Sequence, residues 1–99
     1  MEQAYITGGA RSYIGTENGM YKNIPAEILG AEVIKHIINK YNIKDIDMVV
    51  AGNATGAGGN ITRLMILEAG LPENIPAFTI DMQCGSGLES IAVAAARIQ

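Results

Sequence analysis

The chain has 99 residues, of which 48% are apolar and 17% charged, so it forms one domain at most and lacks the composition of a disordered segment. Seven basic residues against ten acidic ones give a net charge of −3, and the absence of a basic run argues against a nucleic-acid-binding protein. One cysteine excludes an intrachain disulfide, and one cysteine with one histidine cannot form a structural zinc site alone, so we expect no metal. The beginning lacks the pattern of a secretory signal and no apolar run could span a membrane, so we expect a cytoplasmic protein that does not bind membranes.

The first half of the chain predicts a strand, a loop and a helix. A short apolar stretch, Ala4 to Thr7, precedes two glycines and predicts the strand, and residues 11–23 predict the loop. Apolar residues recur at helical spacing from Pro25 to Tyr41, which predicts an amphipathic helix with Pro25 in its first turn. We expect Gly30, inside this helix, to permit a close approach to a neighbouring sheet.

The second half predicts two more strands and two more helices. Met48 to Ala51 is apolar without alternation, as in a strand buried on both faces of a parallel sheet. The glycine-rich residues 52–60 fit neither a dinucleotide fingerprint nor a P-loop, so we interpret them as a turn or interface loop. The remaining predicted elements are a short helix over 61–69 that Gly70 ends, a strand over 77–81 and a final helix over 88–99.

The element order β-α-β-α-β-α predicts an α/β fold with parallel strands, right-handed crossovers and helices on the faces of the sheet. Three strands are few for such a sheet, so we expect a bare strand edge and an incomplete helix layer. The final helix carries no Gly or Pro stop signal. We therefore expect a chain that is truncated or that needs a partner.

Cys84 stands between the last predicted strand and the last helix. Free backbone N–H groups and the helix dipole at such a junction favour an anion, and a thiolate is one. Gly85 and Gly87 leave room for a substrate carbonyl, and we expect the Gly85 N–H to serve an oxyanion. The layout parallels a nucleophile elbow, in which a strained turn between strand and helix presents the nucleophile. The alternative is a small, buried, apolar cysteine.

The other ionisable residues predict no catalytic group. His36 lies in the first predicted helix, off the centre of its apolar stripe, and we interpret it as a solvated or edge histidine. Because it is the only histidine, the chain alone offers no convincing Cys–His dyad. We interpret Asp45 and Asp47, on a connector, as solvated carboxylates.

At residues 81–88, where Cys-Gly-Ser-Gly-Leu follows a strand, the sequence resembles the nucleophile segment of the thiolase family, the acetyl-CoA acetyltransferases. Residues 69–80 resemble the segment that precedes it. Residues 11–15 resemble the family's Arg-Thr-Pro-Ile-Gly, and residues 25–30 and 52–53 also match in order. The resemblance covers essentially the whole chain.

This resemblance implies an acyl-CoA C-acyltransferase that forms or cleaves 3-ketoacyl-CoA through an acyl thioester on Cys84. Coenzyme A thioesters would be substrates in lipid metabolism, no cofactor would be bound permanently, and the CoA-binding residues stay unassigned. The family fold is an αβαβα sandwich of two similar halves. Residues 1–99 would be a partial N-terminal domain, truncated within or after the helix that follows Cys84. Gly85 to Leu88 would shape the turn beneath the active site, and the resemblance implies a homo-oligomer, a dimer or a tetramer.

Three family segments are missing from these 99 residues. They are Gly-His-Pro with the activating histidine, Cys-x-Gly-Gly with a second catalytic cysteine, and Asn-Glu-x-Phe of an oxyanion hole. We therefore expect the chain alone to be inactive. Two alternatives stay open: an enzyme similar to ketoacyl synthases or hydroxymethylglutaryl-CoA synthases, and a non-catalytic, truncated interaction module that pairs with another chain.

Overall fold

The structure, a computed structural model, describes residues 2–56 and 58–99. Helices and strands alternate within this part of the chain, and the two strands run parallel, which confirms the predicted α/β fold. The elements are α1 (Ala26–Tyr41), β1 (Val49–Gly52), α2 (Ile61–Glu68), β2 (Ala77–Ile80) and α3 (Ser86–Ile98).

The two strands form the sheet of the described residues. Val49 lies opposite Ala77 at one end of the ladder, and Gly52 lies opposite Ile80 at the other. The ladder continues by one hydrogen bond past the end of β1, where the Asn53 N–H donates to the Ile80 carbonyl at 3.0 Å. Both strands therefore deliver their carboxyl ends, and the loops that follow them, to the same edge of the sheet.

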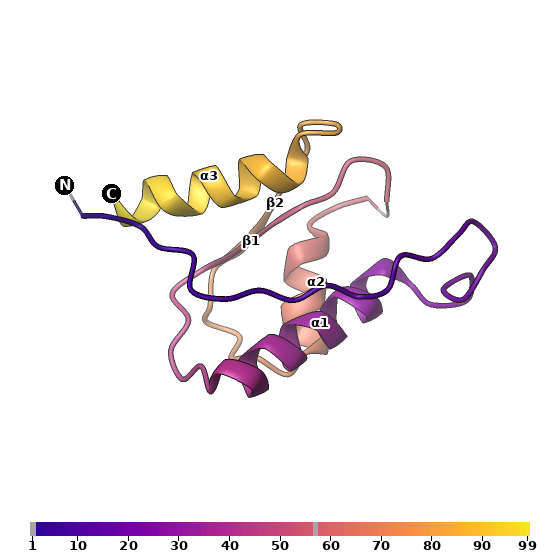
Figure 1. Ribbon diagram of the computed structural model, residues 1–99, viewed down its shortest axis with the longest axis horizontal. Helices are drawn as coiled ribbons and strands as arrows, with labels where there is room; N and C mark the ends of the chain where they lie inside the picture. The colour runs from indigo at the N-terminus through magenta and orange to yellow at the C-terminus, as the bar shows by residue number, and fades with distance from the viewer. Residues whose placement is uncertain (1, 57) are drawn as a thin grey trace.

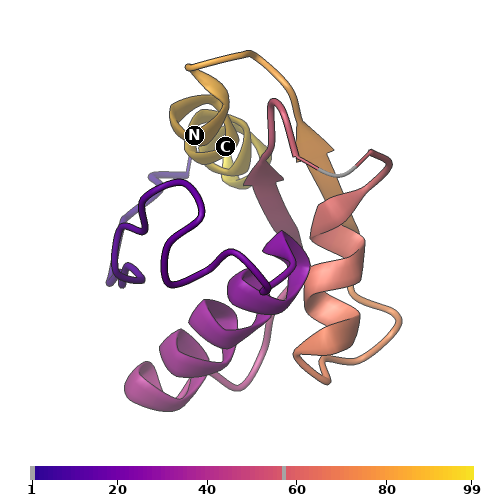
Figure 2. The ribbon, with the colours of Figure 1, turned by 90° about the vertical axis from the view of Figure 1, so that its right-hand side faces the viewer.

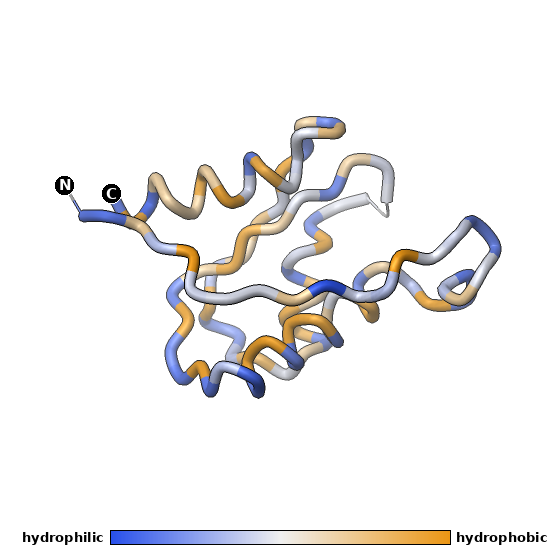
Figure 3. The backbone as a smooth tube through the Cα atoms, in the orientation of Figure 1, coloured by the Kyte–Doolittle hydropathy of each residue, from blue (hydrophilic) through white to orange (hydrophobic). Residues whose placement is uncertain are grey.

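The helices lie on both faces of this sheet. Figures 1 and 2 show α3 along one face, chiefly against β1, and α2 on the other face, against β2. The long helix α1 packs against α2. The apolar positions that predicted α1 recur along its length in Figure 3.

Gly30 lies at a close contact between α1 and α2. A Cβ built on Gly30 would lie 2.6 Å from Sδ of Met65, which belongs to α2. The expected close approach therefore exists, but its partner is a helix and not a sheet. The spacing of apolar residues shows that Gly30 lies on the packed face of its helix. Which element packs against that face depends on the tertiary structure.

Helix α2 is bounded by a cap at each end. The side chain of Asn60 accepts a hydrogen bond from the Arg63 N–H at 3.3 Å, which satisfies a free donor of the first turn. At the other end Gly70 adopts φ +77°, and the Leu71 N–H donates to the Ile66 carbonyl at 3.0 Å. This left-handed glycine ends the helix as its sequence position predicted.

The predicted first strand is wrong, because residues 4–7 form no strand in the described part of the chain. The segment runs past β1 and α3, with Tyr5 and Ile6 exposed. A hollow of about 370 Å³, lined by Ala4, Val50 and Ile91 among others, separates it from both elements. An apolar tetrapeptide becomes a strand only when its backbone pairs with a neighbour, and this gap prevents that pairing.

The fully buried apolar side chains are aliphatic, as the low aromatic content predicted. They centre on α2, whose Ile66 is completely buried. By contrast, the outer face of α3 leaves large apolar side chains in solvent, with Leu88 76% exposed. None of the described helices is long and apolar enough to cross a membrane.

Candidate active site

Cys84 lies in the short turn that joins β2 to α3, as the sequence predicted. The strand ends at Ile80 and the helix begins at Ser86, two residues earlier than expected, so the nucleophile candidate lies two residues before the helix. The Cys84 side chain is exposed. Within the described residues, solvent therefore reaches the Cys84 thiol.

Four hydrogen bonds among Met82, Gln83, Gly85 and Ser86 hold the turn around Cys84. Two join backbone groups: the Gly85 N–H donates to the Met82 carbonyl at 3.0 Å, and the Ser86 N–H donates to the Gln83 carbonyl at 3.1 Å. The other two come from the Ser86 hydroxyl, which accepts from the Met82 N–H at 2.8 Å and donates to the Gln83 carbonyl at 2.7 Å. Such a dense set of local bonds fixes the path of the backbone through Cys84.

The strained residue of this turn is Gln83, which adopts φ +51°. A left-handed conformation is unfavourable for any residue with a Cβ. The Asp81 carboxylate accepts a hydrogen bond from the Gln83 N–H at 3.1 Å and so helps to hold it. Like a nucleophile elbow, this turn joins a strand to a helix and contains a strained residue. Here the strained residue is the one before the cysteine.

Gly85 and Gly87 differ in what their N–H groups do. Gly85 is the N-cap of α3, and its N–H donates to Met82, so it is not available to an oxyanion as we expected. The N–H groups of Gly87 and Leu88, in the first turn of α3, form no hydrogen bond with any residue that the structure describes. Unpaired donors therefore exist in the first turn of α3, further into the helix than Gly85, and the Gly87 nitrogen lies close to Gly52.

The sequence predicted no part in the site for Gly52, and it included Ser86 only within the range Gly85 to Leu88 that would shape the turn. A Cβ on Gly52 would lie 2.6 Å from the Ser86 carbonyl carbon, so the end of β1 touches the first turn of α3 backbone to backbone. The Ser86 side chain is buried under the turn that it bonds. Ser86 belongs to the Cys-Gly-Ser-Gly-Leu motif. A serine at the start of a predicted helix is the feature of the sequence that could have indicated its hydrogen bonds to the turn.

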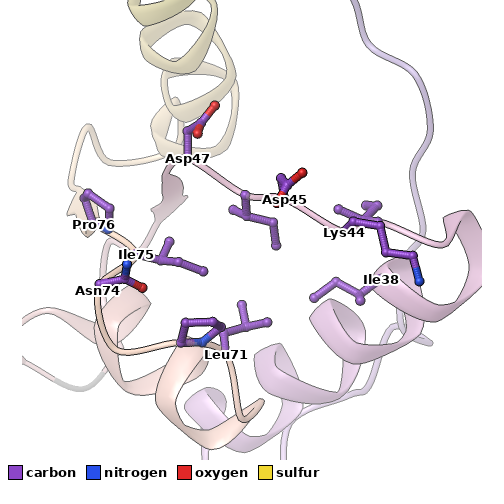
Figure 4. Close-up of a pocket in the computed structure, with 11 residues that line it drawn as sticks. Ile38, Lys44, Asp45, Asp47, Leu71, Asn74, Ile75 and Pro76 are labelled. Carbon is purple, nitrogen blue, oxygen red and sulfur yellow. The ribbon is translucent and has the colours of Figure 1, made fainter.

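The hollow drawn in Figure 4 lies away from Cys84. It has a volume of about 400 Å³ and is lined by residues of the α1 end and of the loops that lead into the strands, including Ile38, Asp47 and Leu71. Asp47 precedes β1 and Pro76 precedes β2, so the hollow opens at the amino ends of the strands. Cys84 follows the carboxyl end of β2. The nucleophile candidate therefore sits at the opposite edge of the sheet.

The remaining ionisable groups do not gather around Cys84. His36 is exposed on α1 and lines a separate hollow of about 360 Å³ with Arg11 and Tyr13. Asp45 and Asp47 are exposed, as expected of solvated carboxylates. Within residues 2–56 and 58–99, no group of three or more His, Cys, Asp or Glu side chains is arranged to hold a metal ion.

The described residues of the glycine-rich loop, at the same edge of the sheet as Cys84, follow local bends. Asn53 accepts a hydrogen bond from the Gly56 N–H at 3.2 Å, and Gly59 adopts φ +78°. Ala57, which the interpretation of residues 52–60 included, lies outside the described residues. The loop joins β1 to α2.

Known proteins resemble this chain along nearly all of its length. The sequence profile of the family described as "Thiolase, N-terminal domain" matches residues 4–99. "Putative acetyl-CoA C-acetyltransferase YhfS" of Bacillus subtilis (strain 168) is 45% identical over 96 residues, which cover 97% of this chain and 26% of the relative. "Putative acetyl-CoA C-acetyltransferase VraB" of Staphylococcus aureus (strain COL) is 46% identical over 101 residues, covering 100% of this chain and 27% of the relative. The chain thus spans about a quarter of the length of these curated relatives.

The fold has a counterpart among solved structures. The crystal structure of the Bacillus anthracis acetyl-CoA acetyltransferase superposes with a TM-score of 0.81 at 30% sequence identity, over 86% of this chain and 23% of that one. Sequence profile, relatives and fold agree with one another, and the segment that carries Cys84 lies where a strand gives way to a helix. The chain therefore belongs to the thiolase family and matches its N-terminal domain.

Proposed function

We propose that this chain is the nucleophile-bearing part of an acyl-CoA C-acyltransferase of the thiolase type. The observation that carries the proposal is the exposed Cys84 on a turn held by four hydrogen bonds, directly before α3. The names of the relatives, acetyl-CoA C-acetyltransferases, support acetyl-CoA as the acyl donor.

In the first half-reaction, the Cys84 thiolate attacks the carbonyl carbon of an acyl-CoA thioester. A bond forms between Sγ and that carbon, the bond to the sulfur of coenzyme A breaks, and the CoA thiolate leaves and takes up a proton. The positive end of the α3 dipole and the open N–H groups of Gly87 and Leu88 stabilise negative charge that develops near the turn.

In the second half-reaction, the acyl group moves from Cys84 to the α-carbon of a second acyl-CoA that has lost a proton there. The product is a 3-ketoacyl-CoA, and the reverse reaction cleaves it with coenzyme A. This step needs a base to remove the α-proton. His36 is exposed on α1, which packs against α2, the helix on the opposite face of the sheet from α3. The base and the second cysteine of the family therefore come from residues outside these 99, and the chain alone is inactive.

Several properties of the working protein belong to this proposal. Its substrates are coenzyme A thioesters of lipid metabolism, it holds no permanent cofactor, and it works in the cytoplasm as a homo-oligomer, a dimer or a tetramer. It binds neither nucleic acid nor membrane. A net charge of −3 supports the first of these two exclusions.

A synthase of the ketoacyl or hydroxymethylglutaryl type would also use a cysteine at such a turn. The names of the relatives favour the thiolase type, and the accessible thiol favours an enzyme over a non-catalytic module. The test uses the complete gene product that contains these residues, incubated with acetyl-CoA. After acid quenching we expect an acetyl group on the peptide that carries Cys84, and we expect acetoacetyl-CoA to form. If this peptide of the complete gene product never carries an acetyl group, the proposal is contradicted.

A further inference from the structure

Ser86 has no free proton to offer to a substrate. It is the first residue of α3 and only 5% exposed. Its hydroxyl proton goes to the Gln83 carbonyl at 2.7 Å, and its oxygen accepts the Met82 N–H at 2.8 Å. A serine hydroxyl has one proton, and here that proton is already used inside the turn.

These two bonds lie on either side of the strained residue. Met82 precedes Gln83, whose φ is +51°, and the carbonyl that Ser86 binds belongs to Gln83 itself. Without the hydroxyl, the Met82 N–H loses its partner and the Gln83 peptide is released on one side. A residue with a Cβ then relaxes towards negative φ, which redirects the chain that enters Cys84.

We propose that Ser86 is a positioning residue for Cys84: its hydroxyl holds Gln83 in the left-handed conformation and so fixes the thiol in front of α3. The proposal rests on the function proposed for Cys84. The hydroxyl acts through the backbone of the turn and touches no substrate. Removing it should slow acyl transfer to Cys84 more than the loss of stability alone explains.

Ser90 offers a matched control. It lies one turn further along α3, is also buried at 8% exposure, and its hydroxyl donates to the Gly87 carbonyl at 2.6 Å. Its replacement by alanine therefore removes a buried serine hydroxyl from the same helix. It leaves untouched the bonds to Met82 and Gln83, which hold the turn.

The experiment compares Ser86→Ala, Ser90→Ala and the unsubstituted complete gene product. The rate of acetyl transfer from acetyl-CoA to Cys84 is measured by quenching and peptide mass, and stability by urea unfolding. We expect both variants to lose stability, but only Ser86→Ala to transfer acetyl about tenfold more slowly, equal to about 1.4 kcal/mol in the barrier. Ser86→Thr, which keeps the hydroxyl, should recover most of the rate. Equal slowing in Ser86→Ala and Ser90→Ala would overturn the inference.

A second readout does not depend on the variants folding or on activity. In the unsubstituted protein, the Met82 amide should exchange its hydrogen slowly, because the Ser86 oxygen binds it. Exchange at the rate of an unprotected amide would overturn the inference. If Cys84 of the unsubstituted protein never accepts acetyl, the proposed function fails and this inference fails with it. If Cys84 accepts acetyl equally fast in Ser86→Ala, this inference alone fails.

Discussion

Gly52 and Ser86 touch through their backbones, at the point where β1 ends and α3 begins. A Cβ on Gly52 would come within 2.6 Å of the Ser86 carbonyl carbon and 2.7 Å of its oxygen. Backbone atoms cannot move aside as the end of a flexible side chain can. The first turn of α3, and with it the approach to Cys84, therefore depends on the absence of a side chain at position 52.

Gly52→Ala should destabilise the chain by about 1–3 kcal/mol, the usual cost of forcing an extra methyl group into a packed site. Gly58→Ala is the control, because a Cβ at Gly58 meets nothing within 4 Å. Urea unfolding of both variants measures the effect. A Gly52→Ala protein as stable as Gly58→Ala would contradict the close contact between β1 and α3.

Thr79→Val should also be destabilising, because Thr79 is the centre of a hydrogen-bond network between β2 and α2. Its hydroxyl accepts from the Thr62 N–H at 3.1 Å and lies 2.7 Å from both the Thr62 hydroxyl and Oδ1 of Asn60. Thr62 is completely buried, so valine would leave its N–H and its hydroxyl without partners. Each buried group left unpaired costs about 1–3 kcal/mol. Thr7→Val, at an exposed position, should change the unfolding free energy by less than about 0.5 kcal/mol.

Arg63 ties α2 to the loop that leads into β2. Its guanidinium donates to the Ile75 carbonyl at 3.1 Å and to the Glu73 carbonyl at 2.9 Å. Arg63→Met keeps the apolar stem and loses both bonds, so we expect a loss of about 1–3 kcal/mol in unfolding free energy. Arg11→Met is the comparison, since the guanidinium of the exposed Arg11 bonds only its neighbour Ser12 among the described residues. Similar losses in the two variants would show that the Arg63 bonds contribute little.

Cys84→Ala should abolish acetyl transfer in the complete gene product, by more than about a thousandfold, because the covalent nucleophile is removed. Cys84→Ser keeps an oxygen in the same place, but a hydroxyl ionises far less readily than a thiol, so this variant should be almost as inactive. Both variants should unfold at nearly the urea concentration of the unsubstituted protein, because the side chain is exposed. Acetyl-CoA consumption is the measurement, and full activity in either variant would remove Cys84 from the mechanism.

Sequence periodicity predicted the position of α1 and β1, although the residues of β1 are only half-buried or exposed and not buried as expected. The apolar spacing of α1 and the unbroken apolar run of β1 place these elements within one residue of their observed bounds. The left-handed Gly70 also ends α2 as expected. Each of these signals lies within the segment that it describes, and so it can be read without knowing the rest of the fold.

The predictions that failed depend on what lies beside a segment. Residues 4–7 have the composition of a strand, but pairing needs the edge of β1, from which a hollow separates them. Gly30 indicated a close neighbour but not that the neighbour is α2. The Gly85 N–H was expected to be free for an oxyanion. Its hydrogen bond to the Met82 carbonyl depends on the conformation of the turn, which the sequence does not give. Non-local packing and the geometry of turns cannot be derived from periodicity.

The left-handed Gln83 also limits which residues natural or laboratory variation can place beside Cys84. Glycine adopts φ +51° without a steric penalty, and asparagine tolerates it better than most residues. Valine, isoleucine and threonine are the residues least compatible with it, because their branched Cβ crowds the backbone there. A library randomised at position 83 and sorted for folding should be enriched in glycine and asparagine and depleted of β-branched residues.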